Sequence, residues 1–517
     1  MGYGSKPPYR YNSLQSSFLS HYLLTYFSDI NPVMNKILGI CAVLCLFSMM
    51  VIGQDNHYEY VPLGSRNSLL PNSGLSRFED QSAVIFNPAT LSAAEGSSFT
   101  FNTTAIGLTT IKFNNGLGQG FNINYGNFTL LPTVAAGVLK PKKKSKDWVL
   151  GYGIYNRVQD KLRFANRDEA KLNVINDTES PGKETYLAQF NLGHEVSEVG
   201  VILGLGWDLN DHLAFGISQA FTYRGEEYTS SFTSSVIPSK DQGATVDLVS
   251  LVTDFYTRYY KIITQTKLGL SAHYGPWDIG LTLGLPSLGI LGTGVVMGEA
   301  NLTNIRLNPD LNTPRSSYFG NGMADNLKAR FRYGTTIGLG ISRPVGNFRF
   351  YGGINWYAPV KNYTILDPGE IGFIQPSTDS NVVYTQKFLR VWGQNKMVLN
   401  GSLGIDWHYQ GNKHMFFSFH SDGHFAINDD KQPGRSLPIK KWDNYHIALG
   451  TQQTFLSSDW LIGLRYSFAK LNNALQPYSF DNPTEDNFLQ GERTRGTLKA
   501  TSIQLILSYS FRFGAKK

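Results

Sequence analysis

The most constraining feature of the sequence is a period-two alternation of apolar residues with small or polar ones. In RYGTTIGLGIS, the segment 332–342, Ile337, Leu339 and Ile341 alternate with glycine, threonine and serine. Successive side chains of a strand point to opposite faces, so such a segment has one apolar face and one small or polar face. The same alternation recurs at 199–209, 277–285, 459–468 and 500–513. The period predicts strands along the whole chain rather than helices.

The connections between these segments alternate between short and long. Turns of a few residues at 209–211, 275–276 and 457–458 alternate with connections of about 20 to 45 residues, as expected for a membrane barrel with one rim of tight turns and one of loops. A soluble sandwich has no reason to alternate in this way. The rule predicts about fourteen strands, an even number that places both ends of the barrel on the short-turn rim. The predicted strands are 97–106, 131–140, 147–156, 199–209, 212–223, 265–274, 277–285, 330–343, 347–357, 397–409, 413–421, 443–453, 459–468 and 500–513.

Composition supports an all-β, transmembrane antiparallel barrel. Charged residues make up 16% of the chain, below the roughly 25% typical of soluble domains. We therefore expect lipid to cover the outer surface. About fourteen strands enclose more space than their own side chains fill, because about eight strands already make a filled interior. The strand-poor segment 54–96 is the predicted luminal plug, and 97–517 is the predicted barrel.

One apolar run near the start predicts export. Residues 34–53 have the short basic start and apolar middle of a signal peptide, which predicts delivery to a Gram-negative outer membrane. A membrane anchor is the alternative, although the run is short against the usual span of about 20 residues. We hypothesise that residues 1–33 are a non-native or unstructured extension. Cys41 and Cys45 both lie in the leader, so the mature chain has no disulfide or cysteine ligand; bulky preceding residues disfavour lipidation of either cysteine.

The plug segment carries a resemblance to a known family. FEDQSAVIFNPATLS, the segment 78–92, resembles the amino-terminal hatch of the FadL/TodX outer-membrane transport family in Asp80, Ser82, Asn87, Pro88 and Ala89. The strand-turn-strand order of the remaining chain is similar as well. The resemblance implies fourteen strands with a hatch in the lumen, no cofactor, and passive uptake of hydrophobic molecules such as long-chain fatty acids. It further implies capture by loops, hatch rearrangement and lateral exit through a kinked third strand.

Two glycines are candidates for that kink. Gly151 and Gly153 lie on the predicted luminal face of the third strand, where glycine permits a bend. The alternative is that they are small inward residues that only make space.

A pair of arginines is a candidate ligand contact. Alternation predicts that Arg330 and Arg332 point into the lumen, where they attract a passing carboxylate head group, while the rings between them point outward. Nucleic-acid binding needs arginines and rings on one surface, so no nucleic-acid partner is expected.

Histidines offer little chemistry. His408 and His414 face each other across a predicted hairpin and are weak candidates for a metal or a pH response, with ordinary lumen lining favoured. The string HSDGH at 420–424 contains serine, histidine and aspartate, the residue types of a hydrolase triad. Adjacent residues of a strand point to opposite faces, however, so these side chains cannot converge as a triad. We expect no catalytic residue, no metal and no enzymatic activity.

Two functions compete. The leading prediction is a channel for hydrophobic small molecules, surrounded by outer-membrane lipid. The alternative is a FadL-like barrel that docks a secreted protein as a shuttle component of a secretion system. The segments 225–264 and 286–329, predicted as long loops, serve either role. An apolar groove between them favours transport, whereas a flat polar surface over a sealed hatch favours docking.

Overall fold

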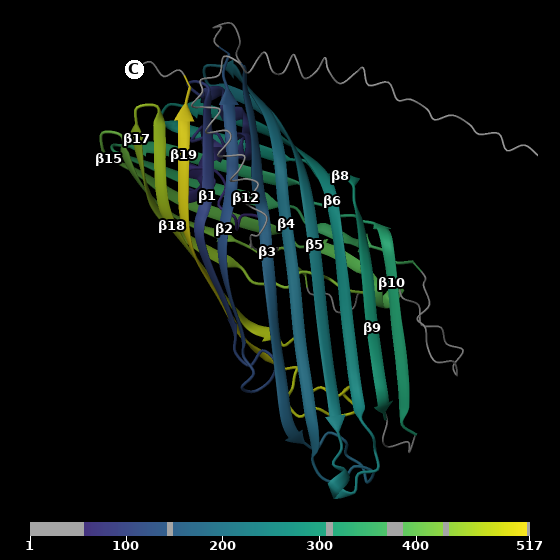
Figure 1. Cartoon of the computed structure of the whole chain (residues 1–517). Helices are drawn as coiled ribbons and strands as arrows, with labels where there is room; N and C mark the ends of the chain where they lie inside the picture. Colours follow the sequence, from purple (N-terminus) through teal and green to yellow (C-terminus); the bar gives the residue numbers. More distant parts are fainter. Residues whose placement is uncertain (1–55, 142–147, 307–313, 370–385, 428–433, 514–517) are drawn as a thin grey trace, which may run out of the picture. The chain divides into compact units, whose positions relative to one another are not determined.

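The computed structural model describes residues 56–141, 148–306, 314–369, 386–427 and 434–513. These residues form a closed antiparallel barrel of fourteen strands (Figure 1). In order around the barrel the strands are β1 (Ser98–Phe113), β2 (Ile123–Leu139), β3 (Trp148–Leu172), β4 (Glu184–Asn210), β5 (Leu213–Ile237), β6 (Val249–Tyr274), β7 (Trp277–Gly284), β11 (Thr336–Val345), β12 (Phe348–Tyr357), β15 (Val398–Gln410), β16 (Lys413–Asp422), β17 (Asn444–Phe455), β18 (Ser458–Leu475) and β19 (Arg495–Arg512). Pairing of β1 with both β2 and β19 closes the sheet.

The fourteen predicted strands are confirmed in number and order, but several are much longer than predicted. Strands β3 to β6 run for 25 to 27 residues, so most of the segment 225–264 is strand rather than loop. The segment 185–194, which precedes the predicted strand 199–209, is the first part of β4. The sequence does not mark these extensions, because beyond the membrane the outer face carries polar residues and the apolar stripe stops.

The segment 286–329 is also mostly strand. It contains β8 (Leu288–Leu291), β9 (Thr293–Ile305) and β10 (Ser316–Lys328), of which β8 and β9 pair with β6, and β10 pairs with β9. A separate two-stranded sheet pairs β13 (Val360–Leu366) with β14 (Val391–Asn395). Two short helices, η2 (Lys240–Gln242) and α6 (Gln386–Leu389), complete the long-loop side.

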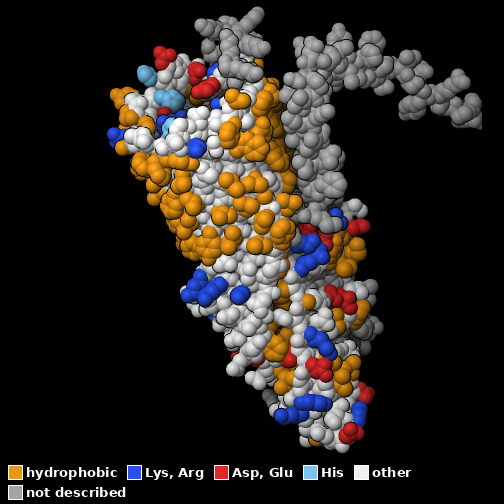
Figure 2. All heavy atoms as spheres, turned by 60° about the vertical axis from the view of Figure 1, so that its left-hand side comes forward, with side chains coloured by type: hydrophobic (Ala, Val, Ile, Leu, Met, Phe, Trp, Pro, Cys, Tyr) orange, Lys and Arg blue, Asp and Glu red, His pale blue; other side chains and the backbone are white. Residues whose placement is uncertain are grey.

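A broad hydrophobic band crosses the upper part of the face shown in Figure 2. On β11, Ile337, Leu339 and Ile341 are exposed on the outer face, as the alternation predicts. Trp460 packs its ring 4.8 Å from that of Tyr509 near the short-turn rim, where an aromatic girdle is expected. Because a closed sheet pairs most of its backbone groups between strands and the outward side chains are apolar, the barrel is built to span a bilayer. Within the described residues no helix has both the length and the apolar character needed to cross a membrane. The predicted leader and the extension before it lie outside those residues.

The plug segment fills the lumen with four short helices, here called the hatch helices. They are α3 (Arg66–Leu69), α4 (Ser73–Ser76), α5 (Ala83–Phe86) and η1 (Pro88–Ala93). Luminal glycines of the barrel give them room. A Cβ atom on Gly280 would lie 1.7 Å from the Leu75 oxygen, and one on Gly216 would lie 2.3 Å from the Ala89 nitrogen. The same close approach to the hatch occurs at Gly151, Gly204, Gly206, Gly269, Gly340, Gly353, Gly404, Gly450 and Gly463. The glycines of the alternating strands therefore accommodate the hatch.

Candidate functional site: a cavity between hatch and wall

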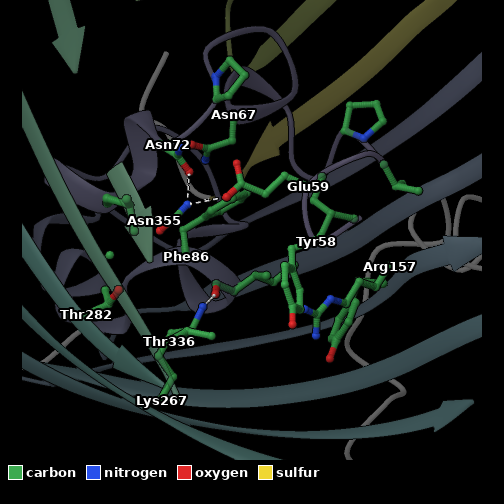
Figure 3. Close-up of a pocket in the computed structure, with 18 of the residues that line it drawn as sticks. Tyr58, Glu59, Asn67, Asn72, Phe86, Arg157, Lys267, Thr282, Thr336 and Asn355 are labelled. Carbon is green, nitrogen blue, oxygen red and sulfur yellow. Dashed lines mark hydrogen bonds between the residues drawn. The ribbon is translucent and has the colours of Figure 1, made fainter. Parts of the chain in front are cut away.

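A cavity of about 160 Å³ lies between the hatch and the barrel wall (Figure 3). Much of its lining is apolar and comes from both sides of the boundary. The hatch contributes Val61, Leu63 and Phe86, and the wall contributes Ile202 on β4 and Ala220 on β5. A site of this kind suits an uncharged hydrophobic ligand.

Most polar groups at the cavity satisfy one another. The amide nitrogen of Asn355 donates to Glu59 and to Asn72, each at 2.8 Å, and both bonds are drawn in Figure 3. The Tyr357 hydroxyl also donates to Glu59 at 2.8 Å. Lys267 donates to the Ile85 carbonyl at 2.5 Å. These bonds tie the hatch to the wall and remove most polar groups from competition for a ligand.

Arg157 is the exception. Its guanidinium lies 4.4 Å from the centre of the Tyr333 ring and 5.9 Å from that of Tyr58, beside which it lies in Figure 3. No hydrogen bond to another described residue accompanies these ring contacts. Arg157 is also unpaired in the β3–β4 ladder, because the register shifts between Asn156 and Val158. This bulge turns Arg157 toward the cavity, and nothing in the sequence pattern marks it.

A buried ionic network lies in the lumen on the long-loop side of the cavity. Arg224 donates to Glu198 and to Glu226, both at 2.7 Å. The Tyr259 hydroxyl donates to Glu226 at 2.5 Å, and His194 lies 3.0 Å from the same carboxylate. The side chains of Arg224 and its two carboxylate partners are at most 4% exposed. One guanidinium therefore holds two buried carboxylates across β4 and β5.

Replacing Arg224 should destabilise the barrel strongly. Arg224→Ala leaves two buried carboxylates without their cation, and breaking such a pair costs about 3–5 kcal/mol of unfolding free energy. Urea unfolding in detergent, followed by the loss of the heat-resistant folded form on gels, measures this change. Arg258→Ala is the control, because Arg258 is 69% exposed and 3.8 Å from Glu227, where a pair is worth less than about 1 kcal/mol. Equal losses in the two variants would contradict the assigned role of the network.

The residues of the hatch motif form internal braces. Asn87 donates to the Leu75 carbonyl at 2.7 Å and to the Leu270 carbonyl of β6 at 3.0 Å, so one side chain joins two parts of the hatch to the wall. Its own oxygen accepts from the Ala89 nitrogen at 3.1 Å, at the start of the 3-10 helix. Pro88 is the first residue of that helix, a position where no backbone donor is needed.

The acidic end of the motif is buried in the same way. Asp80 accepts from the backbone of Ser82 at 2.8 Å and from the backbone of Asn67 at 3.3 Å, and the Ser82 hydroxyl also donates to it. These bonds close the loop before α5. The motif residues fix the shape of the hatch and do not line the cavity.

The ladder between β2 and β3 is interrupted. Only six pairs join these strands, from Val134 with Tyr155 to Leu139 with Leu150, although each strand continues much further along its other neighbour. We call the unpaired stretch the β2–β3 gap. Gly151 and Gly153 lie within the paired part, so the break does not begin at them. A Cβ on Gly151 would meet Leu91 and Val84 of the hatch at 2.9 Å, which fits the space-making alternative.

Two causes of the gap lie next to it. Pro132 of β2 has no backbone donor, and the bulge at Arg157 bends β3. Side chains bridge the strands instead of a ladder. Asn156 donates to the Pro132 carbonyl at 2.5 Å, and the Tyr125 hydroxyl donates to the Lys161 carbonyl. Bridges of this kind can break without unzipping the sheet.

The hatch covers the gap from inside. Tyr60 and Val61 are buried against Leu131 of β2. The buried Lys440 donates to Asp160 of β3 at 2.5 Å beside them. The hatch therefore contacts the strand that borders the gap.

The predicted direction of Arg330 and Arg332 is wrong. Both are exposed, whereas Phe331 and Tyr333 between them are buried and pack against Arg224 and Arg157. The alternation is broken because regular pairing on β11 starts only at Thr336, so the faces before and after the irregular stretch are reversed. Arg332 packs over Tyr363 of β13 at 5.5 Å. The arginines of the barrel wall that do point into the lumen include Arg157, Arg224 and Arg465.

The predicted pairing of His408 with His414 across the β15–β16 hairpin is confirmed. Their rings stack at 4.8 Å with an interplanar angle of 3°. His414 also binds Asp406 at 2.8 Å. Among the described residues, no group of three or more histidine, cysteine, aspartate or glutamate side chains is arranged to hold a metal ion.

The long-loop side contains a second hollow, a groove of about 730 Å³. Phe190, Tyr228 and Tyr478 contribute aromatic surface to it, and Arg435 contributes a cation. The ring of Tyr478 lies 4.8 Å from Phe190 and stacks on Phe232 at 4.4 Å. The groove is more polar than apolar and takes no lining residue from the segment 286–329, so it is not the apolar groove between the two segments that would favour transport over docking.

Ion pairs tie several loops of the long-loop side together. Arg315 pairs with Asp177 at 2.6 Å, Glu179 at 3.0 Å and Glu485 at 2.5 Å, and Arg306 pairs with the first two. Burial opposes the charge of Arg315, but the bonds to Glu485 and the other carboxylates outweigh it and raise its pKa. Three separate loops are thereby held by one guanidinium.

The geometry defines a class of protein: a membrane-spanning barrel with a luminal hatch and an interrupted wall. Solved structures with this fold are FadL/TodX-type outer-membrane transport proteins. The toluene transporter TodX of Pseudomonas putida is 15% identical, with a TM-score of 0.52 over 87% of this chain and 98% of that one. A TodX deltaS2S3 mutant, a monoaromatic hydrocarbon channel, is 14% identical, with a TM-score of 0.52 over 88% of this chain and 100% of that one. A FadL homologue of Pseudomonas aeruginosa is 13% identical, with a TM-score of 0.49 over 90% and 99% of the two chains. No family model and no curated protein matches the sequence.

Proposed function

We propose that this protein is a FadL-type channel of the outer membrane through which small hydrophobic molecules diffuse passively. The observation that carries the proposal is a cavity between hatch and wall whose surface is more apolar than polar, close to an interrupted seam of the barrel.

The proposed route has three stages. Cargo is captured in the aromatic groove around Phe190 and Tyr478 on the extracellular side. It passes the network around Arg224 when the hatch rearranges and enters the cavity beside Ala220. It leaves laterally into the bilayer through the β2–β3 gap once Tyr60 moves away from Leu131. A lateral exit suits apolar cargo, because the cargo never has to enter water.

Cavity size favours small cargo in the observed state. A volume of about 160 Å³ is close to the apolar cavity of about 150 Å³ that holds benzene in an engineered protein, and below the roughly 300–1,000 Å³ of drug-sized pockets. A molecule with one aromatic ring therefore fits, consistent with the toluene transport named for TodX. A long-chain fatty acid requires hatch displacement, and Arg157 is then placed to receive its carboxylate.

Filling the cavity should block uptake of small aromatic cargo. Ala220→Phe places a ring in the cavity, so uptake of radiolabelled toluene by cells should fall to that of cells lacking the barrel. The control is Phe221→Leu on the same strand, because Phe221 is exposed on the lipid-facing side and its loss leaves the cavity unchanged. If the Ala220→Phe variant is present in normal amounts as folded barrel and toluene uptake is unchanged, cargo does not pass through the cavity. Co-purification of a secreted protein with either variant would instead favour the docking function.

A further inference from the structure

Three lysines stand side by side on the outer face of the barrel. The strand register places Lys499 of β19 directly opposite Lys112 of β1 on one side and Lys470 of β18 on the other. All three are exposed. We call this set the lysine row. Neighbouring strands lie about 4.8 Å apart, and like charges placed directly opposite each other are destabilising. A row of three needs a counter-charge.

The described part of the protein does not supply that counter-charge. None of the three lysines has an ion pair with a described acidic side chain. On β3 and β6, two outward arginines do have acidic partners. Arg163 lies 3.6 Å from Glu195, and Arg258 lies 3.8 Å from Glu227. These two outward cations each have a carboxylate partner, whereas the three lysines of the row have none among the described residues.

The height of the lysine row matches a lipid head group. Lys470 follows the girdle residue Trp460 by ten positions on β18, which is about 33 Å along the strand and about 25 Å along the membrane normal at a tilt of 35–45°. The apolar band of such barrels is also about 25 Å tall. Two positions before Lys470, Phe468 is still exposed to lipid. Figure 2 shows basic side chains along the lower edge of the hydrophobic band on this face.

We propose that the lysine row binds the phosphate groups of a phosphorylated glycolipid in the outer leaflet. Two independent features support this proposal. The first is a row of three cations without acidic partners among the described residues. The second is its position, which is separated from the short-turn girdle by about the height of the apolar band and lies next to side chains that face the acyl chains. The glycolipid supplies both partners, phosphate to the ammonium groups and acyl chains to Phe468 and its neighbours. The inference uses the outer-membrane location proposed above but is independent of the cargo and the route.

The test is a titration of the purified full-length barrel in neutral maltoside micelles with diphosphorylated lipid A, with dephosphorylated lipid A as the comparison. Each basic residue near an anionic lipid surface is worth about fivefold in affinity, so K112Q/K470Q/K499Q should raise the Kd for diphosphorylated lipid A about a hundredfold. K112R/K470R/K499R should keep the affinity of the unmodified protein. The matched control is R163Q/R167Q/R258Q, which removes the same charge from exposed, already paired positions and should leave the Kd unchanged.

Three results would overturn the proposal. These are equal affinity of the unmodified barrel for both forms of lipid A, retained affinity in the glutamine variant, and full displacement of the lipid by millimolar inorganic phosphate. Folding of the glutamine variant is judged by its heat-modifiable migration on gels. If that variant does not fold, the affinities of the unmodified protein and of K112R/K470R/K499R for the two forms of lipid A still test the proposal. Loss of toluene uptake in Ala220→Phe without any change in lipid affinity would separate this inference from the transport proposal.

Discussion

Deletion of Arg157 combined with Pro132→Val is expected to reduce uptake of hydrophobic cargo to that of cells without the barrel. Arg157 is the extra residue of the β3 bulge, since Asn156 pairs with Val199 and Val158 pairs with Glu198. Removing it makes the β3–β4 ladder continuous while every later residue keeps its face. Valine at position 132 adds the missing backbone donor of β2. The two strands can then pair beyond Tyr155 and seal the gap. Toluene uptake in cells is the measurement.

The control separates the bulge from the charge. Arg157→Ala keeps the extra residue and Pro132, so the gap stays and toluene uptake should stay close to that of the unmodified protein. The same control should weaken uptake of a carboxylate cargo, because it removes the cation at the cavity. Hydrogen exchange verifies that β2 and β3 are paired in the double variant. If toluene uptake is then unchanged, cargo does not leave through the β2–β3 gap.

Gly280→Ala is expected to dislodge the hatch and open the lumen to water-soluble solutes. The new Cβ would lie 1.7 Å from the Leu75 backbone oxygen, which no rotamer change can relieve. Overpacking of this kind costs about 1–3 kcal/mol, which corresponds to about a 5- to 150-fold rise in the population of the displaced hatch. Conductance of the purified protein in planar bilayers should show frequent open events that the unmodified protein lacks.

Gly401→Ala is the matched control for this substitution. Gly401 also lies on a barrel strand, β15, but a Cβ there would meet nothing within 4 Å. Its conductance should equal that of the unmodified protein. Silent traces from a folded Gly280→Ala barrel would mean that the hatch yields locally and that the close approach of glycine to hatch is unimportant for sealing.

The sequence is sufficient to predict the fold because its strongest signal is physical. An outer face in lipid must be apolar at every second position, and Ile337, Leu339 and Ile341 meet that requirement. About fourteen strands enclose more space than their own side chains fill, which predicts an occupied interior, and the hatch helices occupy it. Strand number and order follow from turn lengths. The hatch motif was located as well, although its residues are braces rather than ligand contacts.

The functional details depend on irregularities that a periodic pattern cannot reveal. One unpaired residue at Arg157 turns a cation toward the cavity, and one irregular stretch before Thr336 reverses the faces of Arg330 and Arg332. At each place the alternation of inward and outward side chains is interrupted, but the neighbouring sequence shows no sign of the interruption. The lysine row is a different case. Lys112, Lys470 and Lys499 are far apart in sequence, and only the register brings them together.

The central claim is that hydrophobic cargo occupies the space between hatch and wall and leaves through the β2–β3 gap. The most direct test is photolabelling of the barrel in lipid nanodiscs with a toluene-sized aryl diazirine, followed by peptide mapping. The account predicts labels on residues 58–63 and 218–220 at the cavity and on 125–131 at the gap, all reduced by excess toluene. Labels confined to lipid-facing side chains such as Leu339 and unaffected by toluene would contradict it.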